Sequence, residues 1–156
     1  MYIYSVGFLK TDPKARYQGY MFYFREGFCW TDVNSTYLKS RLKKNRVFDV
    51  LSMSLFTLHS DIPDWYYVCL INSRLISLYV DNFINNTSHF QINDARQLPI
   101  VIPTTNELNH FEKLFKKAVS IKESQFSNEI SNNIAEQQLN EIQTEIDNLV
   151  NTLYGI

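Results

Sequence analysis

The chain has 156 residues, of which 45% are hydrophobic and 20% are charged, and this balance excludes a disordered chain because a core can be buried. Two cysteines exclude a disulfide framework and favour a reducing compartment. No apolar stretch approaches the roughly 18 residues of a membrane span, and no signal peptide follows Met1. We therefore expect a soluble, cytoplasmic protein without membrane contacts.

The net charge of −1 hides a gradient along the chain. Residues 1–50 carry nine Lys and Arg against four Asp and Glu, whereas residues 104–156 carry four against eight. A polyanionic partner is attracted by clustered cations rather than by the average charge. The first third of the chain is therefore the candidate for contact with a nucleic acid.

The sequence before Pro103 predicts short elements, some of them strands and others helices. Segments rich in aromatic and β-branched residues predict strands at 1–9, 20–24, 46–50 and 53–58. Predicted helices lie at 34–42, with Asn34 or Ser35 as the cap, at 64–71 after Pro63, and from a cap at Asn72-Ser73 to about residue 83. Asn93-Asp94 is expected to form a turn or cap, and residues 99–103 an extended run.

After Pro103 the apolar residues recur at steps of three and four, which predicts two helices, at 105–125 and 132–153. Thr104 and Glu107 form a capping-box pattern, and Gly155 lies where a C-cap glycine is common. The fold class is therefore expected to be α+β, a small mixed sheet with packed helices, followed by a C-terminal helical hairpin or arm. We divide the chain into an α+β domain, 1–103, and a helical connector, 104–156.

Patterns typical of catalytic sites are absent from the sequence. His59, His89 and His110 lie far apart without the spacing of a zinc site, and Cys29 and Cys69 lie in apolar settings typical of buried structural cysteines. The chain has no glycine-rich phosphate loop, no nucleophile elbow and no Asn-Pro-Pro-Tyr tetrapeptide. We expect no catalysis by this chain, no metal site and no cofactor.

The strongest local signal is the basic segment, residues 39–46, which has five cations in eight residues and no acid. Such a run suits a polyanion, although a solvated helix end remains the alternative. Short polar side chains beside the cations could read base edges while Lys and Arg contact phosphates. The candidate DNA-binding residues are Asn34, Ser35, Thr36, Lys39, Arg41, Lys43, Lys44, Arg46 and Arg74.

Five segments in order resemble a known family, namely 26–31, 37–41, 47–49, 68–79 and 90–100. They are similar to the TaqI-like C-terminal specificity domains of type II restriction-modification adenine methyltransferases, to those of BREX phage-exclusion methyltransferases, and to type I specificity subunits. The resemblance implies a domain that binds double-stranded DNA and chooses the sequence, with residues 30–46 facing DNA and Arg41 matching a recurrent arginine. It implies that a separate methyltransferase or restriction subunit performs the chemistry.

The resemblance also implies that the helices of 105–153 act as a connector, and their acidic surface is expected to face away from DNA. The apolar face of 142–153 could instead serve a homodimer or a simple intramolecular hairpin. A protein-interaction module that docks on or inhibits a methyltransferase through these helices is the alternative function. A self-sufficient nuclease would need a metal-binding cluster, for which Asp61, Asp64 and Lys39 are weak candidates.

Overall fold

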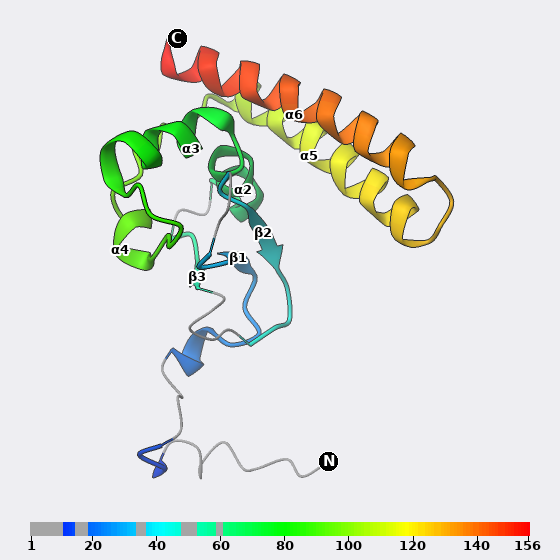
Figure 1. The fold of residues 1–156 in the computed structure, drawn as a ribbon. Coiled ribbons are helices and arrows are strands. Elements are labelled where there is room, and N and C mark those ends of the chain that lie inside the picture. Colours follow the sequence, from blue (N-terminus) through cyan, green and yellow to red (C-terminus); the bar gives the residue numbers. More distant parts are fainter. Residues whose placement is uncertain (1–10, 15–18, 34–36, 48–52, 59–60) are drawn as a thin grey trace.

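The computed structural model describes residues 11–14, 19–33, 37–47, 53–58 and 61–156, which form an α+β fold with a projecting helical hairpin (Figure 1). The predicted fold class is confirmed. In chain order the elements are η1 (Tyr20–Phe22), β1 (Gly27–Trp30), β2 (Ser40–Lys43), β3 (Ser54–Leu55), α2 (Asp64–Ile71), α3 (Arg74–Tyr79), η2 (Val80–Ile84), α4 (Ile92–Ala95), α5 (Thr105–Phe126) and α6 (Asn132–Tyr154).

The sheet has three strands in the order β2-β1-β3. Phe28 in the central strand lies opposite Leu42 on one side and Leu55 on the other. Both pairings are antiparallel, whereas the sequence predicts a mixed sheet. Only residues 31–39 connect β1 to β2, which is enough for antiparallel neighbours, whereas parallel neighbours need a connection of about a dozen residues or more.

The strand predictions before Pro63 are only partly correct. The expected strand at 20–24 is wrong because Tyr20–Phe22 is a 3-10 turn, and the central strand Gly27–Trp30 was not predicted. The expected helix at 34–42 is wrong at its end, where β2 begins at Ser40. The strand at 53–58 is confirmed at Ser54–Leu55. Residues 46 and 47 lie in no strand, and the strand at 1–9 and residues 48–50 lie outside the described residues.

The paired helices α2 and α3 agree with prediction. Helix α2 spans Asp64–Ile71, and the Ser73 hydroxyl caps α3 by accepting a hydrogen bond from the Ile76 amide at 3.3 Å. The π-helical turn η2 continues α3 to Ile84, close to the predicted end at 83. The expected turn at Asn93-Asp94 is part of the short helix α4. Local capping chemistry thus identifies these boundaries well.

Two hydrophobic clusters meet at α2. One lies between α2 and the C-terminal helices, and the other lies between α2, α3 and the sheet. Cys29 and Cys69 are both buried, as predicted, and burial raises the pKa of the Cys69 thiol to about 12. A thiol with so high a pKa stays protonated and is a poor nucleophile at neutral pH, which agrees with a structural role for Cys69. Helix α2 therefore supports both halves of the molecule.

Helices α5 and α6 fold back on each other and form a hairpin, which we call the arm. The capping box is confirmed: the Thr104 amide donates to Glu107 Oε2 at 2.6 Å, and the Glu107 amide donates to Thr104 Oγ1 at 3.4 Å. The Thr104 amide and the Thr104 hydroxyl both donate to the Glu107 carboxylate, and these two hydrogen bonds hold the pKa of Glu107 below its usual value. Gly155 ends α6 with φ of 73°, as its position predicts.

The apolar face of α6 packs inside the molecule. Ile142, Ile146 and Val150 are buried in the cluster with α2 and α5, so the hairpin itself covers the face that could otherwise have served a dimer. The extended run at 99–103 is fastened between the two halves, because the Tyr66 hydroxyl donates to the Val101 carbonyl at 2.7 Å and the Tyr154 hydroxyl to the Pro99 carbonyl. No helix in the described part is long and apolar enough to span a membrane.

Candidate nucleic-acid interface

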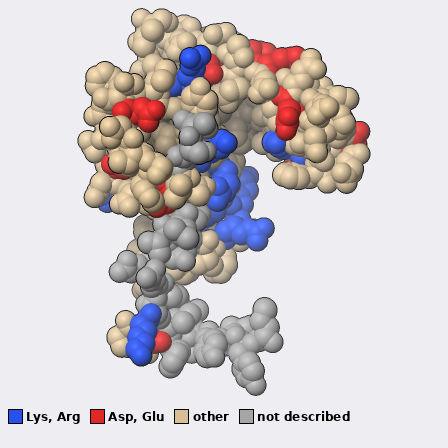
Figure 2. Space-filling view, in the orientation of Figure 1, with Lys and Arg blue, Asp and Glu red and all other residues tan. Residues whose placement is uncertain are grey.

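Lys and Arg side chains gather over β2 and the loop that follows it, beside a hollow where the arm leaves the α+β part (Figure 2). Of the predicted DNA-binding residues, Lys39, Arg41, Lys44 and Arg46 are exposed along this stretch. Arg74 is exposed at the start of α3. Asn34, Ser35 and Thr36 lie outside the described residues.

Most of these cations are available to an external anion. Within the described residues, Lys39 and Arg46 have no acidic partner within salt-bridge distance, and Arg41 donates only a long hydrogen bond of 3.4 Å to the Thr31 hydroxyl. Lys44 pairs with Glu26 at 3.3 Å, but both side chains are largely exposed, and such surface pairs contribute little. The basic segment therefore presents cations whose charges are weakly compensated.

Lys43 differs from its neighbours because it is only 5% exposed. Its ammonium lies 4.6 Å from the centre of the Phe56 ring, and burial lowers its pKa. In this arrangement the ammonium cannot reach a phosphate. Alternation along β2 places Lys43 on the same face as the exposed Arg41, so the difference does not come from the side of the sheet. It comes from Phe56, whose ring lies beside Gly27, the residue opposite Lys43 in β1, and covers this end of the strand.

Asn72 holds β2 in place. Its side-chain oxygen accepts from the Ser40 amide at 2.6 Å, and its side-chain nitrogen donates to the Ser40 carbonyl at 3.0 Å. Both backbone polar groups of Ser40 are thus satisfied by one side chain on the junction between α2 and α3. The sequence identifies this junction as a helix break with a cap, and Ser73 supplies the cap. The contact between Asn72 and β2 was missed, because no local pattern shows which strand will lie beside the break.

Arg74 and Lys39 share a pocket of about 430 Å³ with α6, whose lining there includes Asn140, Gln143 and Asp147. Asp147 Oδ1 accepts from the Arg74 amide at 2.9 Å and from Gln143 Nε2 at 3.2 Å. The same side-chain nitrogen, Gln143 Nε2, also donates to the Asn72 backbone carbonyl at 3.2 Å. These hydrogen bonds fasten α6 to the junction that holds β2.

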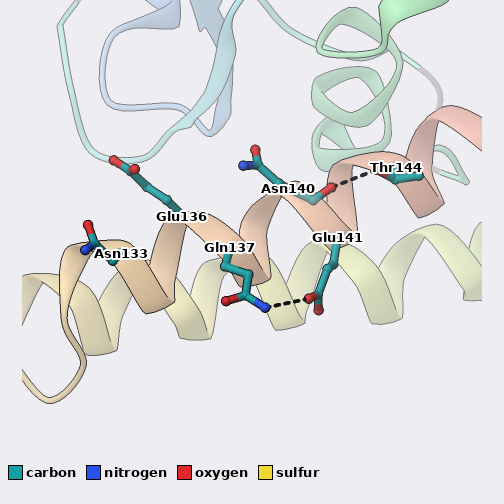
Figure 3. Close-up of a pocket in the computed structure, with 6 residues that line it drawn as sticks. All are labelled: Asn133, Glu136, Gln137, Asn140, Glu141 and Thr144. Carbon is teal, nitrogen blue, oxygen red and sulfur yellow. Dashed lines mark hydrogen bonds between the residues drawn. The ribbon is translucent and has the colours of Figure 1, made fainter.

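The exposed face of α6 continues from this pocket towards the tip of the arm. Figure 3 shows Glu136 and Asn140 pointing to the same side of α6, with Gln137 Nε2 bonded to Glu141 at 3.4 Å. The expectation that the acidic helices face away from DNA stays a prediction, but α6 does line the same pocket as Lys39, at Asn140. The reason is the attachment through Gln143 and Asp147, which no periodicity in α6 predicts.

Segments that carry the family resemblance meet in the fold. Trp30 is fully buried, and its indole nitrogen donates to the Phe90 carbonyl at 2.8 Å. Two residues after Trp30, Asp32 makes two further contacts with the same segment: its Oδ2 lies 2.8 Å from His89 Nδ1, and its carbonyl accepts from the Phe90 amide. These contacts tie the loop after β1, which leads to the basic segment, to the segment before α4.

Asp64, one of the weak candidates for a nuclease site, lies in an environment that explains it as a structural residue. Asp64 is buried at the start of α2, where its Oδ1 accepts from the Thr57 amide at 3.1 Å, and burial raises the pKa of its carboxyl. Among the residues that the structure describes, no three His, Cys, Asp or Glu side chains are grouped so that they could hold a metal ion. The structure thus gives Asp64 a part in positioning the chain after β3.

No family model matches the chain. The chain is similar to the adenine-specific methyltransferase BrxX of Escherichia coli O9:H4 (strain HS), with 30% identity over 116 residues. The match covers 73% of this chain but spans only 9% of the length of that relative. Over most of its length, therefore, the chain is similar to a small part of that methyltransferase.

Proposed function

We propose that the chain binds double-stranded DNA and selects the target sequence for an adenine methyltransferase of a restriction-modification or phage-defence system. Methyl transfer is assigned to a separate catalytic module, not to this chain. The observation that carries the proposal is the row of exposed, weakly compensated cations along β2 and its following loop, namely Lys39, Arg41 and Arg46.

Phosphate contacts explain why such a row is useful. Each Lys or Arg that neutralises a phosphate releases condensed counterions, which makes binding favourable and salt-dependent. Arg41 lies on β2, and Asn72 fixes the backbone of Ser40, which lies between Lys39 and Arg41, so little conformational freedom of this part of the row is lost when DNA binds. Cations on a fixed backbone support recognition better than a mobile tail would.

The similarity to an adenine-specific methyltransferase supports the assignment of the partner. Because the chain corresponds to only 9% of that relative, the matched part is far smaller than the whole methyltransferase. A small α+β module with a helical arm suits a recognition part that is attached to a larger catalytic part. The arm would then connect the two.

The test is fluorescence anisotropy of the full chain with a labelled pool of random duplexes at several salt concentrations. The logarithm of the affinity should fall linearly with the logarithm of salt, and replacing Lys39, Arg41 and Arg46 together with Gln should lower the slope by about 1 for each cation that contacts a phosphate. Arg96→Gln is the control, because Arg96, the residue that follows α4, is exposed and donates a hydrogen bond to Asn93, and α4 lies away from β2 and the basic segment (Figure 1). The proposal is contradicted if the wild-type chain does not bind duplex DNA, or if the triple variant binds it with the same affinity and salt slope as the wild-type chain.

A second candidate function is docking on a methyltransferase through the arm. It is favoured by exposed apolar side chains at the arm's tip, where Phe126 at the end of α5 is 81% exposed and Ile134 near the start of α6 is half exposed. Co-purification with an adenine methyltransferase should then survive neutralisation of the basic segment and be lost in a Phe126→Ser/Ile134→Ser variant. The opposite pattern would remove this candidate.

A further inference from the structure

Phe24 is an exposed aromatic residue with an unusual backbone. Its φ is 65°, in the left-handed region that is sterically unfavourable for a bulky residue. Its side chain is nevertheless 63% exposed, so burial of the ring does not compensate for this conformation. Strained residues of this kind persist where the surrounding structure holds them, and they are concentrated at functional sites.

The contacts on either side of Phe24 hold its backbone and leave its ring outside. The Phe22 ring stacks on Phe56 with 5.0 Å between ring centres, and the Arg25 guanidinium lies 5.2 Å from the Phe22 ring. The Phe24 amide donates to the Arg46 carbonyl at 3.1 Å. Phe22, two residues before Phe24, and Arg25, the next residue, thus both contact Phe56, the latter with its guanidinium 5.7 Å from the ring centre. The Phe24 backbone is fixed to the end of the basic segment.

The surroundings of Phe24 favour one kind of partner. Arg25 follows Phe24 directly, and the Phe24 amide is bonded to the backbone of Arg46; both arginines are exposed, so two cationic residues belong to the same turn region as the exposed ring. Cationic residues near an exposed aromatic ring suit phosphates that lie beside stacked bases. Apolar and aromatic side chains held next to phosphate contacts can insert between base pairs and partly unstack them.

We propose that Phe24 is a stacking wedge, which inserts at a base step of the duplex that the basic segment holds by its phosphates. The inference rests on the proposed function and adds a residue that contacts bases. The rigid turn around Phe56 makes insertion effective, because the ring does not have to be ordered when DNA binds. Phe24 would thereby contribute to selection of the sequence, since base steps differ in how readily they unstack.

The main test is Phe24→Gly, because glycine accepts a φ of 65° without strain and removes only the ring. We would measure anisotropy with a labelled duplex and with the same duplex carrying one central mismatch, and follow thermal unfolding of each variant. The wild-type chain should prefer the mismatched duplex, because a mismatch lowers the unstacking penalty. In Phe24→Gly we expect about a tenfold loss of affinity for the paired duplex and loss of the mismatch preference, with an unchanged salt slope.

Phe83→Ala is the matched control, since Phe83 is 77% exposed on η2 beside Asp81 and should leave both affinities unchanged. Phe24→Asn, which also tolerates the left-handed region, provides a second variant without a ring. Absence of salt-dependent binding in the wild-type chain would overturn the proposed function and this inference with it. Normal binding and an unchanged mismatch preference in both variants would overturn the wedge alone, as would a fall in unfolding temperature that accompanies the loss of affinity.

Discussion

The α+β part and the arm achieve their structures in different ways. The arm is defined by local signals, a capping box at Thr104, regular apolar spacing and a glycine at its end. The strands of the α+β part are short, and β2 is held by pairing with β1 and by Asn72, which is distant in sequence. The candidate interface lies on the part that depends on long-range contacts, so its geometry is sensitive to changes far from DNA.

The largest effect is expected where the two parts share a core. Phe111 of α5 is buried edge-on against Tyr66 of α2, with 5.4 Å between ring centres. Phe111→Ala should lower the free energy of unfolding by about 3–5 kcal/mol, because it leaves a large cavity between the parts. Urea denaturation followed by circular dichroism measures this change. One shared transition in the variant supports a common core, whereas separate transitions would show that the arm and the α+β part unfold independently.

The next effect tests what holds β2. Asn72→Ala removes the partners of the Ser40 amide and carbonyl, so we expect a loss of about 2 kcal/mol in stability, in the range for unsatisfied buried polar groups. DNA affinity should fall as well, although no cation is changed. Asn82→Ala is the control, because the Asn82 side chain is exposed and bonds only the Leu78 carbonyl of its own helix. Equal behaviour of the two variants would show that β2 does not depend on Asn72.

A smaller effect is expected from a change confined to the arm. Thr104→Ala removes the side-chain cap of α5 and should lower stability by about 1 kcal/mol. The affinity for DNA and its salt slope should stay at the wild-type values, because the capping box does not contact the basic segment. Thermal unfolding and anisotropy measure the two properties separately. A parallel loss of DNA affinity would mean that the start of the arm also shapes the interface.

The smallest effect on binding is expected at Lys43. Lys43→Met should leave the salt slope unchanged, since the buried ammonium cannot contact a phosphate, whereas Lys39→Gln should lower the slope by about 1. Burial lowers the pKa of Lys43, so the unfolded chain binds this proton more tightly than the folded chain. Wild-type stability should therefore rise relative to Lys43→Met as the pH increases from the lowered pKa towards 10.5. Denaturant titrations at pH 7 and pH 10 would detect this difference, and a salt slope reduced in Lys43→Met would contradict the burial.

The sequence predicted the basic segment but not its division into exposed and buried cations. Charge and composition identify residues 39–46, whereas the burial of Lys43 depends on Phe56, which the sheet brings beside Gly27, the partner of Lys43 in β1. The prediction of a helix at 34–42 failed for the same reason, because a strand is stabilised by a partner that local sequence does not show. Phe24 was missed because its exposure and positive φ follow from the anchoring of its neighbours on Phe56.

By itself the sequence determined the α+β class, both helices of the arm with their caps, the break at Ser73 and the presence of a basic segment. These features depend on periodicity, capping and charge, which act over a few residues. Only the tertiary structure decided that α6 lies beside Lys39, that Lys43 is buried under Phe56 and that Asn72 holds β2. Each of these depends on residues distant in the chain, which become neighbours only when the core around α2 forms.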